Sequence, residues 1–299
     1  MEIATDSYEV IHKRYSETIV WMSSLGIKLS TGRTAHYERV IRHWKTAYKT
    51  ASPDEAKEVF VDFVSSLFEV QDLISIYLAF KNIPLDQLTG IIEKLKKAVN
   101  GPIFASEEKP KSTTARNFLF EGTVAARLHQ PEKNMLTILN SISDTGVKFN
   151  NKKIWVECKR VTNIDKIEAN TRKASTQLER VLKQKIGSGH RGIVALDVSK
   201  IFHSGDQILV KKDDAELLST IDYLMDQFIS THSDLWESVY ARRDRKIIGT
   251  IIRFSFMCSS EERNLLVQTS QWAINPRHAV SHADEQLQRD LVTAIKSGQ

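Results

Sequence analysis

The sequence predicts an α/β protein in two parts, an all-helical N-terminal domain at residues 1–104 and an α/β domain at residues 105–299. Before residue 100, apolar residues recur at intervals of three and four, the period of an amphipathic helix. After residue 114, continuous apolar runs alternate with helical patterns, as expected for a mixed sheet flanked by helices. The polar stretch ASEEKPKSTT at residues 105–114 marks the predicted boundary.

The N-terminal domain is predicted to be helical from residue 4 to residue 99. Pro53 and Pro84 interrupt the apolar pattern and suit the first turn of a new helix. Several aromatic residues follow the spacing of an apolar stripe. We therefore interpret these aromatic residues as core rather than as a surface for stacking on bases: Trp21, Tyr37, Trp44 and Tyr48.

Strands and helices are predicted to alternate in the second domain. The run GIVALDVS at residues 192–199 has the unbroken apolar character of a strand covered on both faces. In order, the predicted elements are a helix around Glu121, a strand at 135–140, two strands within 142–160, a helix at 164–186, the strand at 192–199, a helix at 213–236, strands at 246–257 and 264–272, and a helix at 280–296.

Residues 142–160, ISDTGVKFNNKKIWVECKR, are predicted to form a β-hairpin. The two asparagines at positions 150 and 151 tolerate the positive φ angles of a tight turn. If they form the turn, Phe149 pairs with Lys152, and counting outward places Asp144 opposite Glu157. Side chains alternate faces along a strand, so Glu157 and Lys159 share one face with Trp155.

Asp144, Glu157 and Lys159 form the pattern D-x12-E-x-K, which brings two carboxylates and an ammonium to one patch of the hairpin. Like charges opposed across a ladder destabilise it, and a divalent cation relieves the repulsion. Similar triplets occur at a helix start, in the polar linker and in a charged turn: Glu55-Ala56-Lys57, Glu107-Glu108-Lys109 and Asp244-Arg245-Lys246. Only the Glu157 triplet is embedded in an apolar strand.

The arrangement resembles the PD-(D/E)xK nuclease superfamily over roughly residues 114–199, which implies a restriction-endonuclease-like fold. The resemblance implies that Glu121, in the preceding helix, joins the site as a catalytic and metal-binding residue. It also implies roles for Gln177 in the following helix and for the backbone carbonyl of Cys158 as a metal ligand. The chain departs from the family pattern at two positions: Ser143 replaces the usual proline, and Val181 stands where some branches have Tyr or Lys.

Phosphodiester cleavage needs an activated water and stabilisation of charge on the phosphate, which metal ions supply. The oxygen ligands of Asp144 and Glu157 suit Mg²⁺ or Mn²⁺. Lys159 is predicted to orient the attacking water and stabilise the transition state, and Gln177 to steady the nucleophile or a phosphate. In the alternative interpretation, Asp144 is a turn acid, while Glu157 and Lys159 form an exposed strand pair worth little.

Positive charge is concentrated in the middle of the chain. Residues 101–212 contain 20 Lys and Arg against 11 Asp and Glu, whereas residues 1–100 contain 13 of each. Basic surface attracts phosphate, so we expect a nucleic-acid backbone here, with DNA as the partner and RNA not excluded. A solvated basic face is the alternative. The predicted nucleic-acid contacts are Lys166, Arg172, Lys173 and Arg180.

Other functional classes are disfavoured. No apolar run approaches the roughly 18 residues of a membrane span, and a cytoplasmic protein is expected. Cys158 and Cys258 are interpreted as buried free thiols. The glycines at positions 187, 189 and 192 match G-x-G-x-x-G, but they follow a helix and precede a strand. They therefore predict a flexible connection rather than a dinucleotide site.

Together these observations predict a Mg²⁺-dependent deoxyribonuclease. Its helical domain would serve partner binding, homodimerisation or target recognition. One alternative is a non-catalytic DNA-binding module on a nuclease-derived fold. Another is a helical interaction protein in which the α/β part is only a scaffold.

Overall fold

The structure is a computed structural model that describes residues 6–109, 112–139, 141–202, 207–262 and 266–296 of the 299-residue chain. These residues form two compact units that interleave along the sequence. Unit 1 comprises Met1–Thr123, His203–Asp214 and Phe256–Thr269, and unit 2 comprises Val124–Phe202, Ala215–Ser255 and Ser270–Gln299. The predicted domain boundary at residues 104 and 105 stays a prediction.

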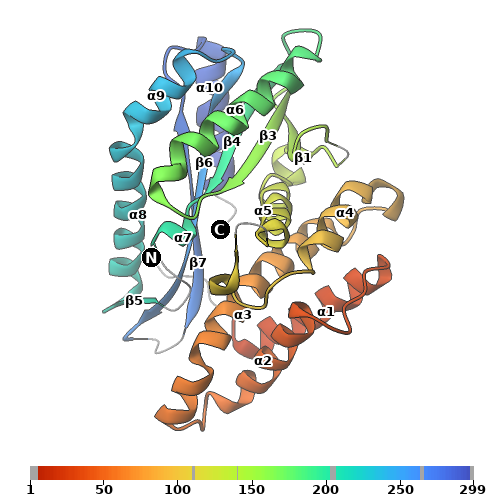
Figure 1. Cartoon of the computed structure of the whole chain (residues 1–299), viewed down its shortest axis with the longest axis vertical. Coiled ribbons are helices and arrows are strands. Elements are labelled where there is room, and N and C mark those ends of the chain that lie inside the picture. The colour runs from red at the N-terminus through yellow and green to blue at the C-terminus, as the bar shows by residue number, and fades with distance from the viewer. Residues whose placement is uncertain (1–5, 110–111, 140, 203–206, 263–265, 297–299) are drawn as a thin grey trace. The chain divides into compact units, whose positions relative to one another are not determined.

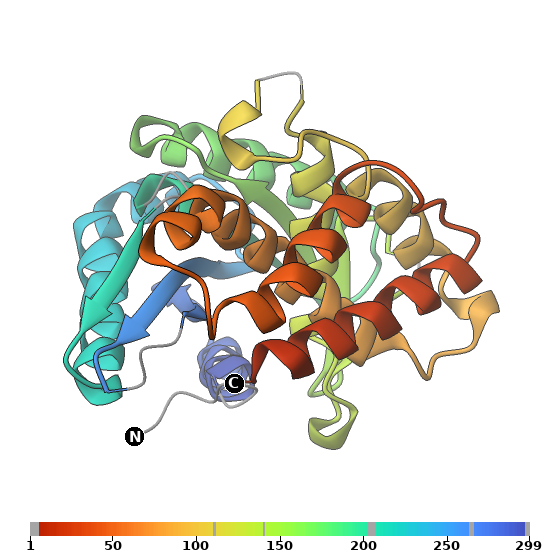
Figure 2. The same cartoon turned by 90° about the horizontal axis from the view of Figure 1, so that it is seen from below.

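Unit 1 begins with the predicted helical region. Ser52 and Glu55 form a capping box that starts α3, so the backbone donors of its first turn are satisfied. Helices α1, α2 and α3 pack side by side (Figures 1 and 2). The elements are α1 (Tyr8–Ser24), α2 (Arg33–Ala47), α3 (Pro53–Phe80), η1 (Leu85–Gln87), α4 (Thr89–Ala98), η2 (Ala105–Glu107) and α5 (Thr114–Arg127), which ends in unit 2.

The prediction that four aromatic residues form core is correct only for Tyr37, which is fully buried. Trp21, Trp44 and Tyr48 are half-buried. Large rings at the edge of a helix interface pack one side and leave the other exposed: Trp44 packs on Phe63 with ring centroids 5.5 Å apart. Trp21 lies beside Tyr77, at 5.7 Å, in a surface groove of about 780 Å³.

A buried ion-pair network that the sequence analysis did not predict links the helices of unit 1. Nε of Arg116 on α5 donates to Glu69 of α3 at 2.5 Å, and the Arg33 guanidinium of α2 lies 3.2 Å from the other oxygen of Glu69. Arg116 also lies 3.6 Å from Glu108, which follows η2. Because Arg33, Arg116 and Glu69 are all buried, removal of one partner would leave an uncompensated charge in the interior of unit 1.

Two later segments complete unit 1. Strand β5 (Ile208–Lys211), which was not predicted, pairs in parallel with the end of β6 (Ile247–Ser260), from Ile208↔Met257 to Lys211↔Ser260. The hydroxyl of Tyr8 on α1 accepts from the amide of Leu266 at 3.1 Å. Burial raises the pKa of Tyr8 to about 12.

A mixed sheet forms the centre of unit 2. Its strands are β1 (Leu136–Thr137), β2 (Thr145–Phe149), β3 (Lys152–Arg160), β4 (His190–Asp197), β6 and β7 (Val267–Pro276). The order is β1-β2-β3-β4-β6, with β7 also paired with β6. The first three strands are antiparallel neighbours, whereas β3, β4 and β6 run parallel. Gly249 of β6 has φ 155°, and a Cβ there would lie 2.6 Å from the carbonyl oxygen of Asn275, so a side chain at this position would clash with backbone.

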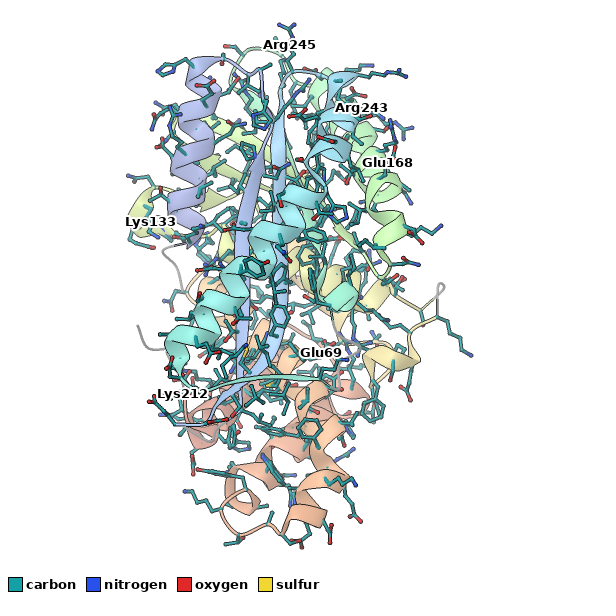
Figure 3. The ribbon with its side chains drawn as sticks, turned by 90° about the vertical axis from the view of Figure 1, so that its left-hand side faces the viewer. Glu69, Lys133, Glu168, Lys212, Arg243 and Arg245 are labelled. Atoms are coloured by element: carbon teal, nitrogen blue, oxygen red, sulfur yellow. The ribbon has the colours of Figure 1, made fainter. Side chains whose placement is uncertain are left out.

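Helices cover both faces of this sheet. Helix α6 packs on β3 and β4, and Figure 3 shows α6 and α10 on opposite sides of the strands. Most of β4 is buried, as predicted for a strand covered on both faces. The remaining elements are η3 (Pro131–Lys133), η4 (Ile164–Lys166), α6 (Ile167–Lys183), α7 (Ser199–Phe202), α8 (Asp214–Thr231), α9 (Ser233–Ala241) and α10 (His282–Lys296).

Two predicted elements need correction. The single helix predicted at 213–236 is two helices, α8 and α9. They are separated at His232, which leaves helical geometry with φ −108° and ψ 9° while its ring Nδ1 contacts the carbonyl of Phe228. The strand predicted at 135–140 extends only over Leu136–Thr137, because pairing with β2 covers just those residues; residue 140 lies outside the described residues.

The molecule is thus an α/β protein in which a helical region, α1–α5, precedes a mixed, curled sheet with interspersed helices. Within the described residues, each helix is too short or too polar to cross a bilayer.

Candidate active site

The predicted hairpin is confirmed as β2 and β3. Asn150 and Asn151 form its turn with φ angles of 46° and 58°. The register runs from Phe149↔Lys152 outward to Thr145↔Val156. The asparagine pair and the alternation of apolar residues therefore fix the strand pairing that counting along the sequence predicted.

Asp144 lies one residue before the first paired residue of β2. Its Oδ2 accepts the backbone N–H of Cys158 at 2.7 Å, which ties the carboxylate to the neighbouring strand. A side-chain acceptor thus replaces the next carbonyl of the ladder. Asp144 is consequently held by β3 itself and faces the Glu157–Lys159 segment.

Lys159 lies close to both acids of the site. Its Nζ lies 3.5 Å from Oδ2 of Asp144 and 3.6 Å from Oε2 of Glu157, and it donates to the carbonyl of Cys158 at 2.9 Å. The side chains are 24% exposed for Asp144, 16% for Lys159 and 5% for Glu157. The group is therefore buried at Glu157 and open toward solvent at Asp144. We call Asp144, Glu157 and Lys159 the triad.

Helix α6 accounts for the burial of Glu157. Gly192 of β4 pairs with Trp155, so both residues face the same side as Glu157. A Cβ on Gly192 would lie 3.3 Å from Leu182 and 3.4 Å from Leu178, both on α6. Helix α6 therefore covers the face of the sheet that carries Glu157 and Lys159.

The donors at the hairpin are oxygen atoms. Two carboxylates and the carbonyl of Cys158 meet around one ammonium, and hard oxygen donors of this kind fit Mg²⁺ or Mn²⁺. In the part of the chain that the structure describes, no three His, Cys, Asp or Glu side chains gather as a metal-binding group. A cation at the hairpin would therefore rely on two carboxylates, a carbonyl and water.

Glu121 is part of unit 1, whereas the hairpin belongs to unit 2. It is buried on α5 and forms an ion pair with Lys94 of α4. The expectation that Glu121 joins the hairpin site stays a prediction.

Gln177 lies on α6, the helix that covers the triad face. Its Oε1 is buried and makes no hydrogen bond within the described residues, although the residue as a whole is half-buried. A buried amide oxygen without a protein partner suits a bound water or ligand. Its proposed role stays a prediction.

Three of the four predicted nucleic-acid contacts lie at seven-residue intervals, one at the end of η4 and two on α6. Lys166, Lys173 and Arg180 are exposed. Arg172 is half-buried and pairs with Glu168, at 2.6 Å. The helix thus presents cations to solvent, and their contact with nucleic acid stays a prediction.

The competing triplets have structural roles. Glu55 lies at the start of α3, as expected, and its side chain completes the capping box with Ser52. Asp244 accepts the backbone N–H of Lys246 in a turn at 2.9 Å. Glu108, predicted to lie in a linker, instead has a side chain only 1% exposed and pairs with Arg116. No local pattern marked Glu108 as buried, since its partner lies in the next helix.

Comparisons of the chain with models of protein families, with curated protein sequences and with solved structures found no match.

Proposed function

We propose that this protein is a metal-dependent nuclease that hydrolyses DNA phosphodiester bonds at the triad, on a sheet of the restriction-endonuclease-like type. The observation that carries the proposal is the convergence of two carboxylates on one lysine: Lys159 Nζ lies within 3.6 Å of both Asp144 and Glu157. This convergence occurs on a β-hairpin with the D-x12-E-x-K spacing.

Asp144, Glu157 and the carbonyl of Cys158 would hold the cation. When bound, Mg²⁺ or Mn²⁺ supplies an activated water and neutralises charge on the phosphate. The low exposure of Glu157 strengthens its attraction for a cation, because charges interact more strongly away from bulk water.

Lys159 has two roles in this proposal. Its ammonium orients the attacking water, and it stabilises the negative charge that develops on the phosphate oxygens. The hydrogen bond from Cys158 to Asp144 keeps the carboxylate pointed at the same place, so little reorganisation is needed during reaction. The more exposed side, at Asp144, is where a phosphate approaches.

The test is a cleavage assay on plasmid, linear duplex, single-stranded DNA and RNA, with Mg²⁺, Mn²⁺ or EDTA. Wild type should cut DNA only with metal, and Asp144→Asn and Lys159→Ala should each lower the rate by about 100-fold or more. Lys57→Ala is the matched control, because Lys57 completes the same kind of triplet at an exposed position of α3 and should leave the rate unchanged.

Metal-dependent cutting that survives both triad substitutions would overturn the proposal. Duplex binding without cleavage by wild type would instead favour the non-catalytic DNA-binding alternative.

A further inference from the structure

A group of cationic side chains surrounds the loop between α6 and β4, at the end of β3 remote from Lys159. Nζ of Lys152 lies 3.4 Å from the carbonyl of Ser188, and Nη1 of Arg191 donates to the same carbonyl at 2.8 Å. Nζ of Lys246 lies 3.5 Å from the carbonyl of Gly187. The set that we call the loop patch consists of Lys152, Lys153, Lys185, His190, Arg191 and Lys246.

The lysines of the loop patch are not neutralised by acids. Lys152, Lys153, Lys185 and Lys246 form no ion pair with any Asp or Glu that the structure describes. Asp284 neutralises one member of the patch, Arg191, at 2.5 Å, whereas Glu179 pairs with Arg243 outside the patch, at 3.0 Å. The four lysines keep their charge. The loop patch therefore presents net positive charge.

The pKa of His190, a member of the loop patch, reflects the positive charge around it. Burial first, and then the charges of Lys153, Lys185 and Lys246, lower the pKa of His190. Three ammonium groups are thus close enough to disfavour a further positive charge at one imidazole. A potential of this kind attracts anions.

The loop itself is open. Neither Gly187, with φ 96°, nor Gly189 has any atom within 4 Å of the place where a Cβ would stand, and Ile186 is 97% exposed. These glycines belong to the G-x-G-x-x-G match that the sequence analysis interpreted as a flexible connection. Figure 3 shows Arg245, which precedes Lys246, projecting at the same end of unit 2. An extended anion can therefore approach the cations without displacing side chains.

We propose that the loop patch binds the sugar-phosphate backbone of nucleic acid at a distance from the reacting phosphate. The choice of nucleic acid as the anion rests on the proposed nuclease function. Lys153 and Lys159 are six residues apart on β3, which corresponds to about 20 Å of strand. A duplex rises about 3.4 Å per base pair, so for a duplex axis parallel to β3 the patch contacts the flank about six base pairs from the cut. Such contacts add affinity without reading sequence.

The test measures binding of a fluorescent duplex of about 30 base pairs in EDTA over a range of salt concentrations. The variant carries Lys153→Gln, Lys185→Gln and Lys246→Gln. The control removes the same charge from exposed lysines of unit 1 through Lys28→Gln, Lys57→Gln and Lys96→Gln. A plot of the logarithm of the association constant against the logarithm of salt concentration has a negative slope. The magnitude of this slope should be smaller by about three in the patch variant and unchanged in the control.

Three outcomes would overturn the proposal: an unchanged slope in the patch variant, an equal loss in the control, or patch-dependent binding to vesicles of phosphatidylserine and phosphatidylcholine but not to duplex. The assay contains no metal, so binding can be measured even if wild type never cuts DNA. A wild-type protein that never cuts DNA would contradict only the nuclease proposal. Conversely, if the enzyme is active and its patch variant binds duplex with the wild-type slope, only the proposed role of the loop patch is contradicted.

Discussion

Unit 1 and unit 2 each contain a buried group of opposite charges, and the two groups differ in composition and exposure. In unit 1, Arg33 and Arg116 meet Glu69 and Glu108, and every one of these side chains is at most 9% exposed. In unit 2, the triad has two acids and one base, and Asp144 is 24% exposed. A buried charge cluster alone therefore does not indicate a site. An excess of one sign that opens toward solvent is what distinguishes the triad, and it is the feature on which the proposed function relies.

The largest expected effect is on the stability of unit 1. Arg116→Met removes the cation between Glu69 and Glu108 and should lower the free energy of unfolding by about 3–5 kcal/mol, because buried acids lose their compensation. Urea unfolding followed by circular dichroism measures it. Arg172→Met is the control and should leave the midpoint in place, because Arg172 and Glu168 form a surface pair with side chains 41% and 51% exposed. An equal shift in both variants would contradict a special role for the network.

Asp144→Asn should have the opposite effect, with a large loss of cleavage activity and little change in stability. Cleavage should fall by about 100-fold or more, since an amide binds cations poorly. The stability without metal should change by less than about 0.5 kcal/mol, because the Asn carbonyl still accepts the Cys158 N–H. The paired measurements are plasmid cleavage and urea unfolding in EDTA. A large loss of stability would make the triad structural, like the network of unit 1.

Metal binding should stabilise only the protein that retains both triad acids. At a Mg²⁺ concentration about 100 times the Kd, the free energy of unfolding should rise by about 2.7 kcal/mol in wild type and remain unchanged in Asp144→Asn. Thermal unfolding with and without EDTA gives the comparison. If Mg²⁺ stabilises both proteins equally, the ion binds somewhere other than the hairpin.

The smallest expected effect concerns Cys258 of unit 1. Burial raises the pKa of this thiol to about 12, so at about pH 8 almost none of it is the reactive thiolate. Iodoacetamide should label it slowly in wild type, with a rate that increases as pH rises toward the pKa, and faster in Arg116→Met. Mass spectrometry of the labelled peptide tests this. Rapid labelling in folded wild type would show that this part of unit 1 opens readily.

The sequence predicted features that depend on neighbours along the chain. The two asparagines specify the turn, and alternation then fixes which side chains share a face, so the sequence alone placed Glu157 and Lys159 beside Asp144. The helix start at Ser52 and Pro53, where Glu55 lies in the first turn, was predicted from equally local signals. The break at His232 was not predicted, because neither Gly nor Pro marks it and the helical pattern continues through it.

Features made by distant partners were not predicted. Glu69 and Arg116 are 47 residues apart, and nothing near either residue indicates that they meet. The loop patch gathers side chains from the start of β3, the α6–β4 loop, the start of β4 and the residue before β6, so its charge becomes concentrated only in the folded chain. Strand β5 has four residues, too few for a periodic signal.

The interleaving of the two units along the chain has a practical consequence for dividing the protein into fragments. Unit 1 needs residues 256–269, which follow most of unit 2 in the chain, and Tyr8 binds Leu266 within that segment. A fragment ending at residue 104 would lack these residues, so the Tyr8 hydroxyl would lose its backbone partner at Leu266 while the ring kept its contacts with Tyr48 and Phe63. A cut near residue 104 would therefore divide unit 1 rather than release it.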